Sequence, residues 1–257
     1  MLELSRRYSR LGNIEGTIIR SEGVDLLGTI YIGLGEGKRP TALLLHGLPG
    51  FEKNVDIAYG LREIGWNVLI PHYRGSWGSD GDYRFTGVPT DVKNSITHIE
   101  TKPYVDNEKI FLIGHSLGAW ATIITTAQDK RVKGGVAVSG GISTKPTETE
   151  TRGNTHVMNL IKQKFLKNIT FEEAVEDLIK RGSELASQNW IGKISPRPLP
   201  MIGGEQDEAA TPERVKALYA YAKEPKKLVM IKDADHVFTK KRRDLVKTVT
   251  DWLKEQV

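Results

Sequence analysis

The segment at residues 110–119 reads IFLIGHSLGA, and it decides the fold. Its first four residues form an uninterrupted apolar run, which is typical of a strand buried on both faces of a sheet. A helical pattern starts at Leu117, so strand and helix meet at Ser116 with almost no loop between them. Such a sharp turn strains the serine backbone and needs small neighbours, which Gly114 and Gly118 supply. We therefore expect the Ser116 hydroxyl above the carboxyl edge of a sheet, at the positive end of a helix.

The rest of the chain alternates between strand and helix patterns. An N-terminal hairpin is expected first, and then strands that alternate with helices. Because successive strands separated by helices need crossover connections, they should lie parallel, with helices on both faces of an α/β sheet. The expected strands cover residues 15–20, 26–32, 41–45, 66–70, 109–113, 132–138, 200–203 and 227–231. The expected helices cover residues 53–64, 92–100, 117–127, 212–222 and 238–255, with Thr90 or Asp91 as the cap of the second.

Residues 142–195 interrupt this alternation. Two amphipathic helices fit there, at 157–166 and 171–185, and Thr170 with Glu173 forms a capping box for the second. We expect a helical lid insertion at 142–195 in a core domain made of residues 1–141 and 196–257.

A serine at neutral pH needs a base before it becomes a good nucleophile. Of the six histidines, His236 follows the last predicted strand, on a loop from which an imidazole can reach over the sheet edge. His46 and His72 also lie at strand ends, so geometry alone does not exclude them. His115 precedes the serine on a tight turn, and we expect it to be a packing or hydrogen-bonding group.

A carboxylate should orient the imidazole and stabilise its charged form. Asp207, in the loop after the strand at 200–203, is the preferred residue, and Glu205 and Glu208 are close rivals. Asp235 is adjacent to His236 in sequence and is badly placed to reach around to its Nδ1. These three residues occur along the chain in the order Ser, Asp, His.

Acyl transfer also needs two donors that stabilise an oxyanion. The amide of Leu117 points to the side of Ser116 where that oxygen would form. The second donor is expected in the loop HGLPG at residues 46–50, which follows a buried strand. Pro49 has no N–H, so Leu48 is the best candidate and Gly50 the reserve.

Composition excludes several classes of protein. The 257 residues are 39% hydrophobic and 27% charged, with a formal charge of +5 and no cysteine. No disulfide, thiolate metal site or cysteine nucleophile is therefore available. No apolar run approaches the roughly 20 residues that span a bilayer, and no signal peptide, metal-ligand spacing or stacking platform for bases is evident. We therefore expect no membrane, metal or nucleic-acid partner and, by default, a cytoplasmic location. The basic run at 240–243 is assigned to the solvated face of the last helix, where it would suit the negative end of the helix dipole.

Taken together, these segments resemble the α/β-hydrolase superfamily. The matching positions are His46-Gly47, the Gly114-x-Ser116-x-Gly118 turn, the Asp207 loop and the His236 loop. The stretch YRGSWGS at 73–79 resembles in particular the esterase and acylaminoacyl-peptidase-like branch of S9-type serine hydrolases. The resemblance implies an eight-stranded, mostly parallel sheet with a helical lid, and hydrolysis through an acyl-enzyme without metal or cofactor. Epoxide hydrolases and dehalogenases share the Gly-x-Pro motif, but they use an aspartate nucleophile where this chain has Ser116.

The sequence therefore predicts a carboxylic-ester hydrolase acting on a small-molecule acyl ester. The alternatives are an aminopeptidase-like or thioesterase activity with the same triad, or an inactive binding module on the same fold. A homo-oligomer is left open. The acyl pocket is expected beneath the insertion, with Trp77 near its edge and Trp120 either there or in the core. Insertion residues expected to line it are Met158, Ile161, Phe165 and Leu178.

Overall fold

A computed structural model describes residues 13–140 and 155–257, so the first thirteen residues of the expected insertion, 142–154, lie outside the described residues. Eight strands form one sheet in the order β1-β2-β4-β3-β5-β6-β7-β8. Only β2 runs against the others; every pairing from β4 to β8 is parallel. The predicted α/β class is confirmed. The strands are β1 (Ile14–Ser21), β2 (Val24–Tyr31), β3 (Arg39–Leu45), β4 (Asn67–Pro71), β5 (Val105–His115), β6 (Val132–Val138), β7 (Leu199–Gly204) and β8 (Lys226–Ile231).

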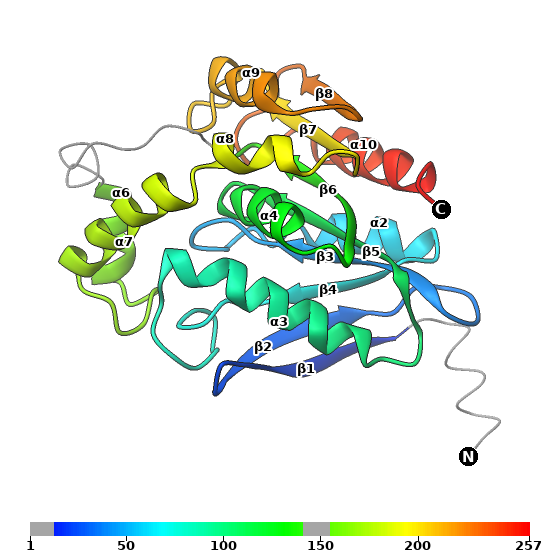
Figure 1. Cartoon of the computed structure of the whole chain (residues 1–257), viewed down its shortest axis with the longest axis horizontal. Coiled ribbons are helices and arrows are strands. Elements are labelled where there is room, and N and C mark those ends of the chain that lie inside the picture. Colours follow the sequence, from blue (N-terminus) through cyan, green and yellow to red (C-terminus); the bar gives the residue numbers. More distant parts are fainter. Residues whose placement is uncertain (1–12, 141–154) are drawn as a thin grey trace.

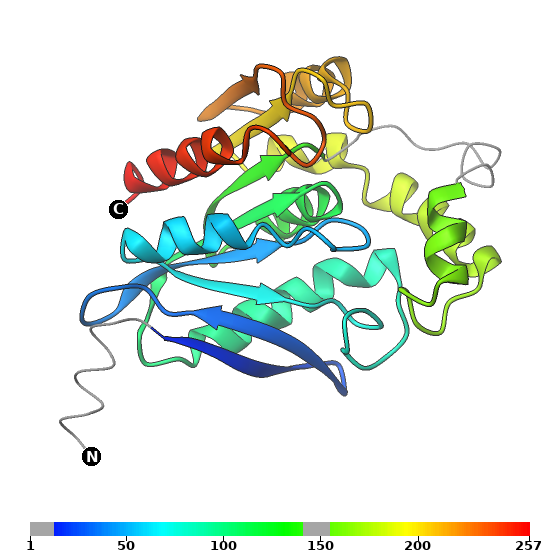
Figure 2. The same cartoon turned by 180° about the vertical axis from the view of Figure 1, so that it is seen from behind.

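Helices cover both faces of this sheet. Helices α3, α4 and α9 lie on the face seen in Figure 1, and α2 and α10 lie on the face seen in Figure 2. The helices are α2 (Val55–Glu63), α3 (Val88–Glu100), α4 (Leu117–Gln128), α6 (Thr155–Lys162), α7 (Phe171–Glu184), α8 (Ser187–Trp190), α9 (Pro212–Tyr221) and α10 (Arg242–Lys254), with short 3₁₀ turns η1 (Phe85–Gly87) and η2 (Ile191–Lys193).

The alternation of side chains along β3 shows how each face receives its own core. Leu43 and Leu45 pack with the residues of α3 and α4, whereas Leu44 packs with those of α2 and α10. All three are at most 1% exposed. A strand buried on both faces has to be apolar at consecutive positions, which is the pattern that the sequence shows.

The structure corrects the starts of two helices. Helix α3 begins at Val88, with Gly87 as its cap, so neither Thr90 nor Asp91 caps it. Asp91 is fully buried instead, and its carboxylate accepts hydrogen bonds from Ser21 Oγ (2.8 Å), the Arg74 amide (2.9 Å) and Arg74 Nε (2.9 Å). These contacts connect the turn after β4 to the β1–β2 hairpin and to α3. Because the Asp91 carboxylate makes them, it is not available to cap α3.

Helix α10 begins at Arg242 rather than near residue 238, because Phe238 has a left-handed backbone (φ 58°) and turns precede the helix. The basic run at 240–243 therefore lies at the positive end of α10, contrary to the prediction. Arg242 offsets this placement with an ion pair to Asp56 and a hydrogen bond to Asn54 Oδ1 (2.9 Å).

Between β6 and β7 the chain leaves the sheet and forms α6 and α7. The predicted capping box is present: the Glu173 amide donates to Thr170 Oγ1 (3.2 Å) and the Thr170 amide donates to the Glu173 carboxylate (2.8 Å). Both helices lie at the end of the sheet toward which the parallel strands point (Figure 2). Since loops at that end carry the predicted site residues, α6 and α7 stand directly over them.

Candidate active site

Ser116 occupies the turn between β5 and α4 with φ 55° and ψ −113°, a conformation that few non-glycine residues adopt. A methyl group on Gly114 would overlap the carbonyl of Gly118, and one on Gly118 would overlap the carbonyl of Leu45. The predicted requirement for two glycines is therefore met by backbone atoms that leave no space for a side chain.

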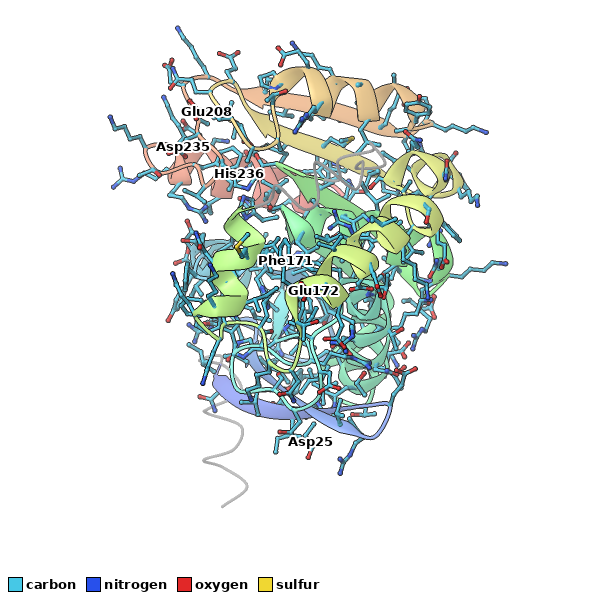
Figure 3. The ribbon with its side chains drawn as sticks, turned by 90° about the vertical axis from the view of Figure 1, so that its left-hand side faces the viewer. Asp25, Phe171, Glu172, Glu208, Asp235 and His236 are labelled. Atoms are coloured by element: carbon cyan, nitrogen blue, oxygen red, sulfur yellow. The ribbon has the colours of Figure 1, made fainter. Side chains whose placement is uncertain are left out.

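Three distant segments bring the expected serine, histidine and aspartate together. His236 Nε2 lies 3.1 Å from Ser116 Oγ, and His236 Nδ1 lies 3.0 Å from both carboxylate oxygens of Asp207. A carboxylate can only accept, so Nδ1 carries the ring hydrogen and Nε2 presents its lone pair to the serine hydroxyl. Figure 3 looks onto this end of the sheet, with α6 and α7 in front and His236 in the loop before α10. The arrangement can move a proton from Oγ to the imidazole.

Asp207 is held as an ionised acceptor. Its side chain is buried, and the amides of Ala209 (2.9 Å) and Ala210 (2.8 Å) donate to Oδ1. Burial alone raises the pKa of Asp207, but the hydrogen bonds from His236 and Ala210 and the charge of His236 outweigh it and lower the pKa below its ordinary value. Glu205, Glu208 and Asp235 do not take this position; Asp235 instead accepts from the Thr239 amide (2.8 Å).

The other histidines at this edge have structural partners. His46 is 1% exposed and its Nδ1 donates to the Gly47 carbonyl (2.8 Å), and burial lowers its pKa to about 3. His72 Nδ1 donates to the Trp77 carbonyl (3.1 Å). His115 Nε2 donates to the His236 carbonyl (2.7 Å), while burial and the neighbouring His236 lower its pKa to about 4. His115 is thus the hydrogen-bonding group that the sequence predicted, and it holds the backbone of His236.

The loop at 46–50 passes directly beside the serine. A methyl group on Gly47 would lie 3.1 Å from Ser116 Cβ, so the backbone at Gly47 runs close to the serine side chain. Leu48 and Leu117 both line the cavity at Ser116. These positions agree with two backbone donors on the same side of the serine, which is the arrangement that an oxyanion requires.

A cavity of about 490 Å³ opens at Ser116, within the usual size range of a small-molecule site. Apolar side chains make up most of its wall, and α6 and α7 contribute to it. The lining residues are Leu48, Phe85, Ser116, Leu117, Trp120, Ser139, Gly140, Val157, Leu178, Arg181, Ala209, Ala210 and His236. The expected Leu178 is among them, and so is Trp120, which also belongs to the core.

The other expected pocket residues do not line this cavity. Trp77, Met158, Ile161 and Phe165 are absent from its described wall. Phe165 packs edge-on against Phe51 (4.9 Å between ring centroids) and lies 6.4 Å from the ring of Trp77, beside the cavity. For Met158 the cause is helix geometry: neighbours on a helix point about 100° apart, so Val157 lines the cavity and Met158 does not.

Sequence reasoning did not predict several residues of the described wall: Phe85, Ser139, Gly140, Val157, Arg181, Ala209 and Ala210. Arg181 is the charged residue among them. Its guanidinium carbon lies 5.2 Å from the ring centroid of Trp120 and 5.8 Å from that of Phe85. The available signal was its position three residues after Leu178, on the buried face of α7 that also carries Asp177. Among the described residues, no group of three histidine, cysteine, aspartate or glutamate side chains is placed to hold a metal ion. No helix of this part of the chain is long and apolar enough to cross a membrane.

The sheet order, the turn at Ser116 and the helices on both faces define an α/β-hydrolase. Solved structures of that class match over nearly the whole chain: an α/β-hydrolase, GrgF, from Penicillium sp. sh18 (TM-score 0.77, 20% identity, 95% of this chain and 98% of that one), and Est1E from Butyrivibrio proteoclasticus with bound ferulic acid (TM-score 0.77, 19% identity, 93% and 98%). Residues 54–257 match the sequence profile of the prolyl oligopeptidase family, and the chain belongs to that family.

Curated relatives match over a smaller part of the chain. The uncharacterised protein YfhR of Escherichia coli O157:H7 is 25% identical over 177 residues, which cover 69% of this chain and 55% of YfhR. The chain thus spans about half the length of that relative. A thiohydrolase, apmlB, of Arthrinium phaeospermum is 27% identical over 198 residues, covering 62% of this chain and 63% of its own.

Proposed function

We propose that this protein is a serine hydrolase that cleaves carboxylic esters of small molecules through an acyl-enzyme. The observation that carries the proposal is the unbroken chain of contacts from Asp207 through His236 to Ser116 at 3.0 and 3.1 Å. Ser116 Oγ attacks the acyl carbon while His236 Nε2 takes its proton. The same imidazole then protonates the leaving alcohol, which leaves an acyl-enzyme. Water attacks the acyl-enzyme in the same way, and the acid is released.

Each further residue has a role in this scheme. Asp207 keeps the Nδ1 tautomer and stabilises the imidazolium that forms in each half-reaction. The amides of Leu48 and Leu117 stabilise the oxyanion of the tetrahedral intermediate. The insertion at 142–195 acts as a lid over the acyl pocket. Val157 and Leu178, which belong to it and line the cavity at Ser116, support this role. No step calls for a metal or a cofactor.

The size and apolar wall of the cavity suit the acyl group of a small molecule. We place esters before amides and thioesters because a solved structure of the same fold, Est1E, holds ferulic acid. Thioester hydrolysis by the same residues is the second candidate, because one relative is named a thiohydrolase. A panel of one acyl group presented as p-nitrophenyl ester, thioester and anilide separates these activities.

The test uses p-nitrophenyl butyrate as substrate. Ser116→Ala and His236→Ala should each lower kcat by roughly 10³-fold or more, because nucleophile and base act as a unit. His72→Gln is the matched control, since His72 stands at the same edge of the sheet but donates to the Trp77 carbonyl; it should keep kcat within a few-fold. Unchanged turnover in Ser116→Ala would reject the proposal.

A further inference from the structure

Arg181 brings a positive charge into the cavity that holds the nucleophile. It is the only described lining residue whose side chain carries a permanent charge; the rest of the wall is apolar or neutral apart from the titratable His236. Arg181 is partly exposed, and keeping even a partly buried charge without a partner beside an apolar wall is costly. The position therefore calls for an explanation beyond packing.

Asp177 acts on Arg181 through its charge but not through a direct contact, because its oxygens accept hydrogen bonds from other groups. Asp177 lies one turn earlier on α7, at the spacing that normally favours an ion pair. Its oxygens accept instead from the Phe85 amide, the Thr86 amide (3.3 Å) and the Thr86 hydroxyl. Within the described chain Arg181 makes no ion pair within 4 Å and its side chain makes no hydrogen bond. The guanidinium is thus positioned by Trp120 and Phe85 while its donors stay unused.

The surroundings of Arg181 fix it in place. Trp120 Nε1 donates to the Leu185 carbonyl (2.8 Å), which fastens the end of α7 to α4, directly beyond the nucleophile. The Leu185 amide donates in turn to the Arg181 carbonyl (3.0 Å). Burial lowers the pKa of Arg181 from its ordinary value, in keeping with a charge that lacks sufficient compensation. A partly buried cation beside an apolar wall, whose side-chain donors bond no described residue, is suited to bidentate recognition of a carboxylate.

We propose that Arg181 recognises a carboxylate on the substrate, remote from the scissile bond, so that the preferred esters are anionic. This inference rests on the proposed function and narrows its substrate class. The carboxylate could belong to the acyl part, as in a half-ester of a dicarboxylic acid, or to the leaving alcohol. Both present the same chemistry to the guanidinium, and the experiment separates them.

Two matched substrate pairs test the proposal. The first pair is mono-p-nitrophenyl adipate, which carries a free carboxylate on the acyl side, and methyl p-nitrophenyl adipate, in which that carboxylate is methylated. The corresponding glutarate and suberate half-esters then show which acyl length is preferred. The second is the butyrate ester of 4-hydroxyphenylacetic acid and its methyl ester, in which the carboxylate is on the leaving group. The measured quantity is the ratio of kcat/KM for the charged substrate to that for its neutral partner.

In one of the two pairs Arg181→Met should lower this ratio by roughly 10- to 100-fold, the usual effect of losing a charge-assisted hydrogen bond, and Arg181→Lys should retain part of it. Lys180→Met is the matched control: it removes a neighbouring positive charge that points to solvent, and the ratio should stay at the wild-type value. Equal losses on charged and neutral substrates, or an unchanged ratio in both pairs, would overturn the proposal.

A failure of the proposed function gives a different pattern. If no ester of either pair is hydrolysed, titration calorimetry with adipate still tests the site. Binding to Ser116→Ala that disappears in the Ser116→Ala, Arg181→Met double variant supports carboxylate recognition without esterase activity. Absence of adipate binding to both would overturn it.

Discussion

Two buried histidines should make this fold sensitive to mild acid. His46 and His115 are 1% and 4% exposed, and burial lowers their pKa values to about 3 and about 4 from the ordinary value of 6.5. Both remain neutral in the folded protein at pH 5, whereas they take up protons in the unfolded chain as the pH falls below 6.5. Proton uptake by the unfolded state favours unfolding, so this stability is present above pH 6.5 and is lost progressively below it.

The size of the effect follows from those pKa values. Each histidine lowers the free energy of unfolding by about 1.4 kcal/mol for each pH unit below 6.5, as long as the pH stays above its folded pKa. At pH 5 this amounts to about 2 kcal/mol for each histidine and about 4 kcal/mol for the pair. Such a loss is a large share of the roughly 5–15 kcal/mol that stabilises a typical protein.

Urea unfolding at pH 8 and pH 5, followed by tryptophan fluorescence and circular dichroism, measures this difference. A His46→Gln variant supplies the internal test, because whatever its stability at pH 8, its loss between pH 8 and 5 should be smaller than that of the wild type by about 2 kcal/mol. Equal stability at the two pH values, or a variant that keeps the full pH dependence, would refute the assignment of buried neutral histidines.

Three further predictions concern the site and its frame. Asp207→Asn should lower kcat on p-nitrophenyl butyrate by roughly 10³- to 10⁴-fold, because an amide no longer fixes the Nδ1–H tautomer, whereas Glu208→Gln should stay within a few-fold of wild type; comparable losses in the two variants would count against the chosen acid. Gly118→Ala should lower the unfolding free energy by more than about 3 kcal/mol or prevent folding, since its methyl group would meet the Leu45 carbonyl, and thermal unfolding at wild-type temperature would show that the turn has more room. Asp91→Ala should cost about 3 kcal/mol in urea unfolding, because Arg74, whose side chain is 17% exposed, would keep only the exposed Glu22 as an ion-pair partner, and a loss below 1 kcal/mol would mean that the Asp91 pair is not stabilising.

The parts of the fold that sequence predicted are those with local causes. The run at 110–113 has to be a buried strand because four consecutive apolar residues suit no half-exposed element. Gly114 and Gly118 are required by backbone atoms within a few residues of Ser116 or on the neighbouring strand. The order of Ser116, Asp207 and His236 along the chain then follows from the strand ends on which they lie, and the structure places all three within hydrogen-bonding distance.

What sequence could not predict depends on contacts between distant segments. Asp91 looks like a helix cap in the sequence, and only the position of Arg74, seventeen residues earlier, shows that it is a buried partner. The wall of the cavity depends on the rotation of α6 and α7 as they pack, and a rotation by one residue exchanges Met158 for Val157. Arg181 is the clearest case, because a charged residue at the edge of the buried face of α7 can be a surface residue or a binding group until the position of Ser116 is known.

Covalent labelling of the nucleophile tests the central claim most directly. A fluorophosphonate probe reacts at a useful rate only with a serine that a base has activated. The wild-type protein should be labelled stoichiometrically, peptide mass spectrometry should place the adduct on Ser116, and His236→Ala should abolish the labelling. An adduct on another residue, or a folded protein that the probe does not modify, would contradict the claim that Ser116, His236 and Asp207 act together.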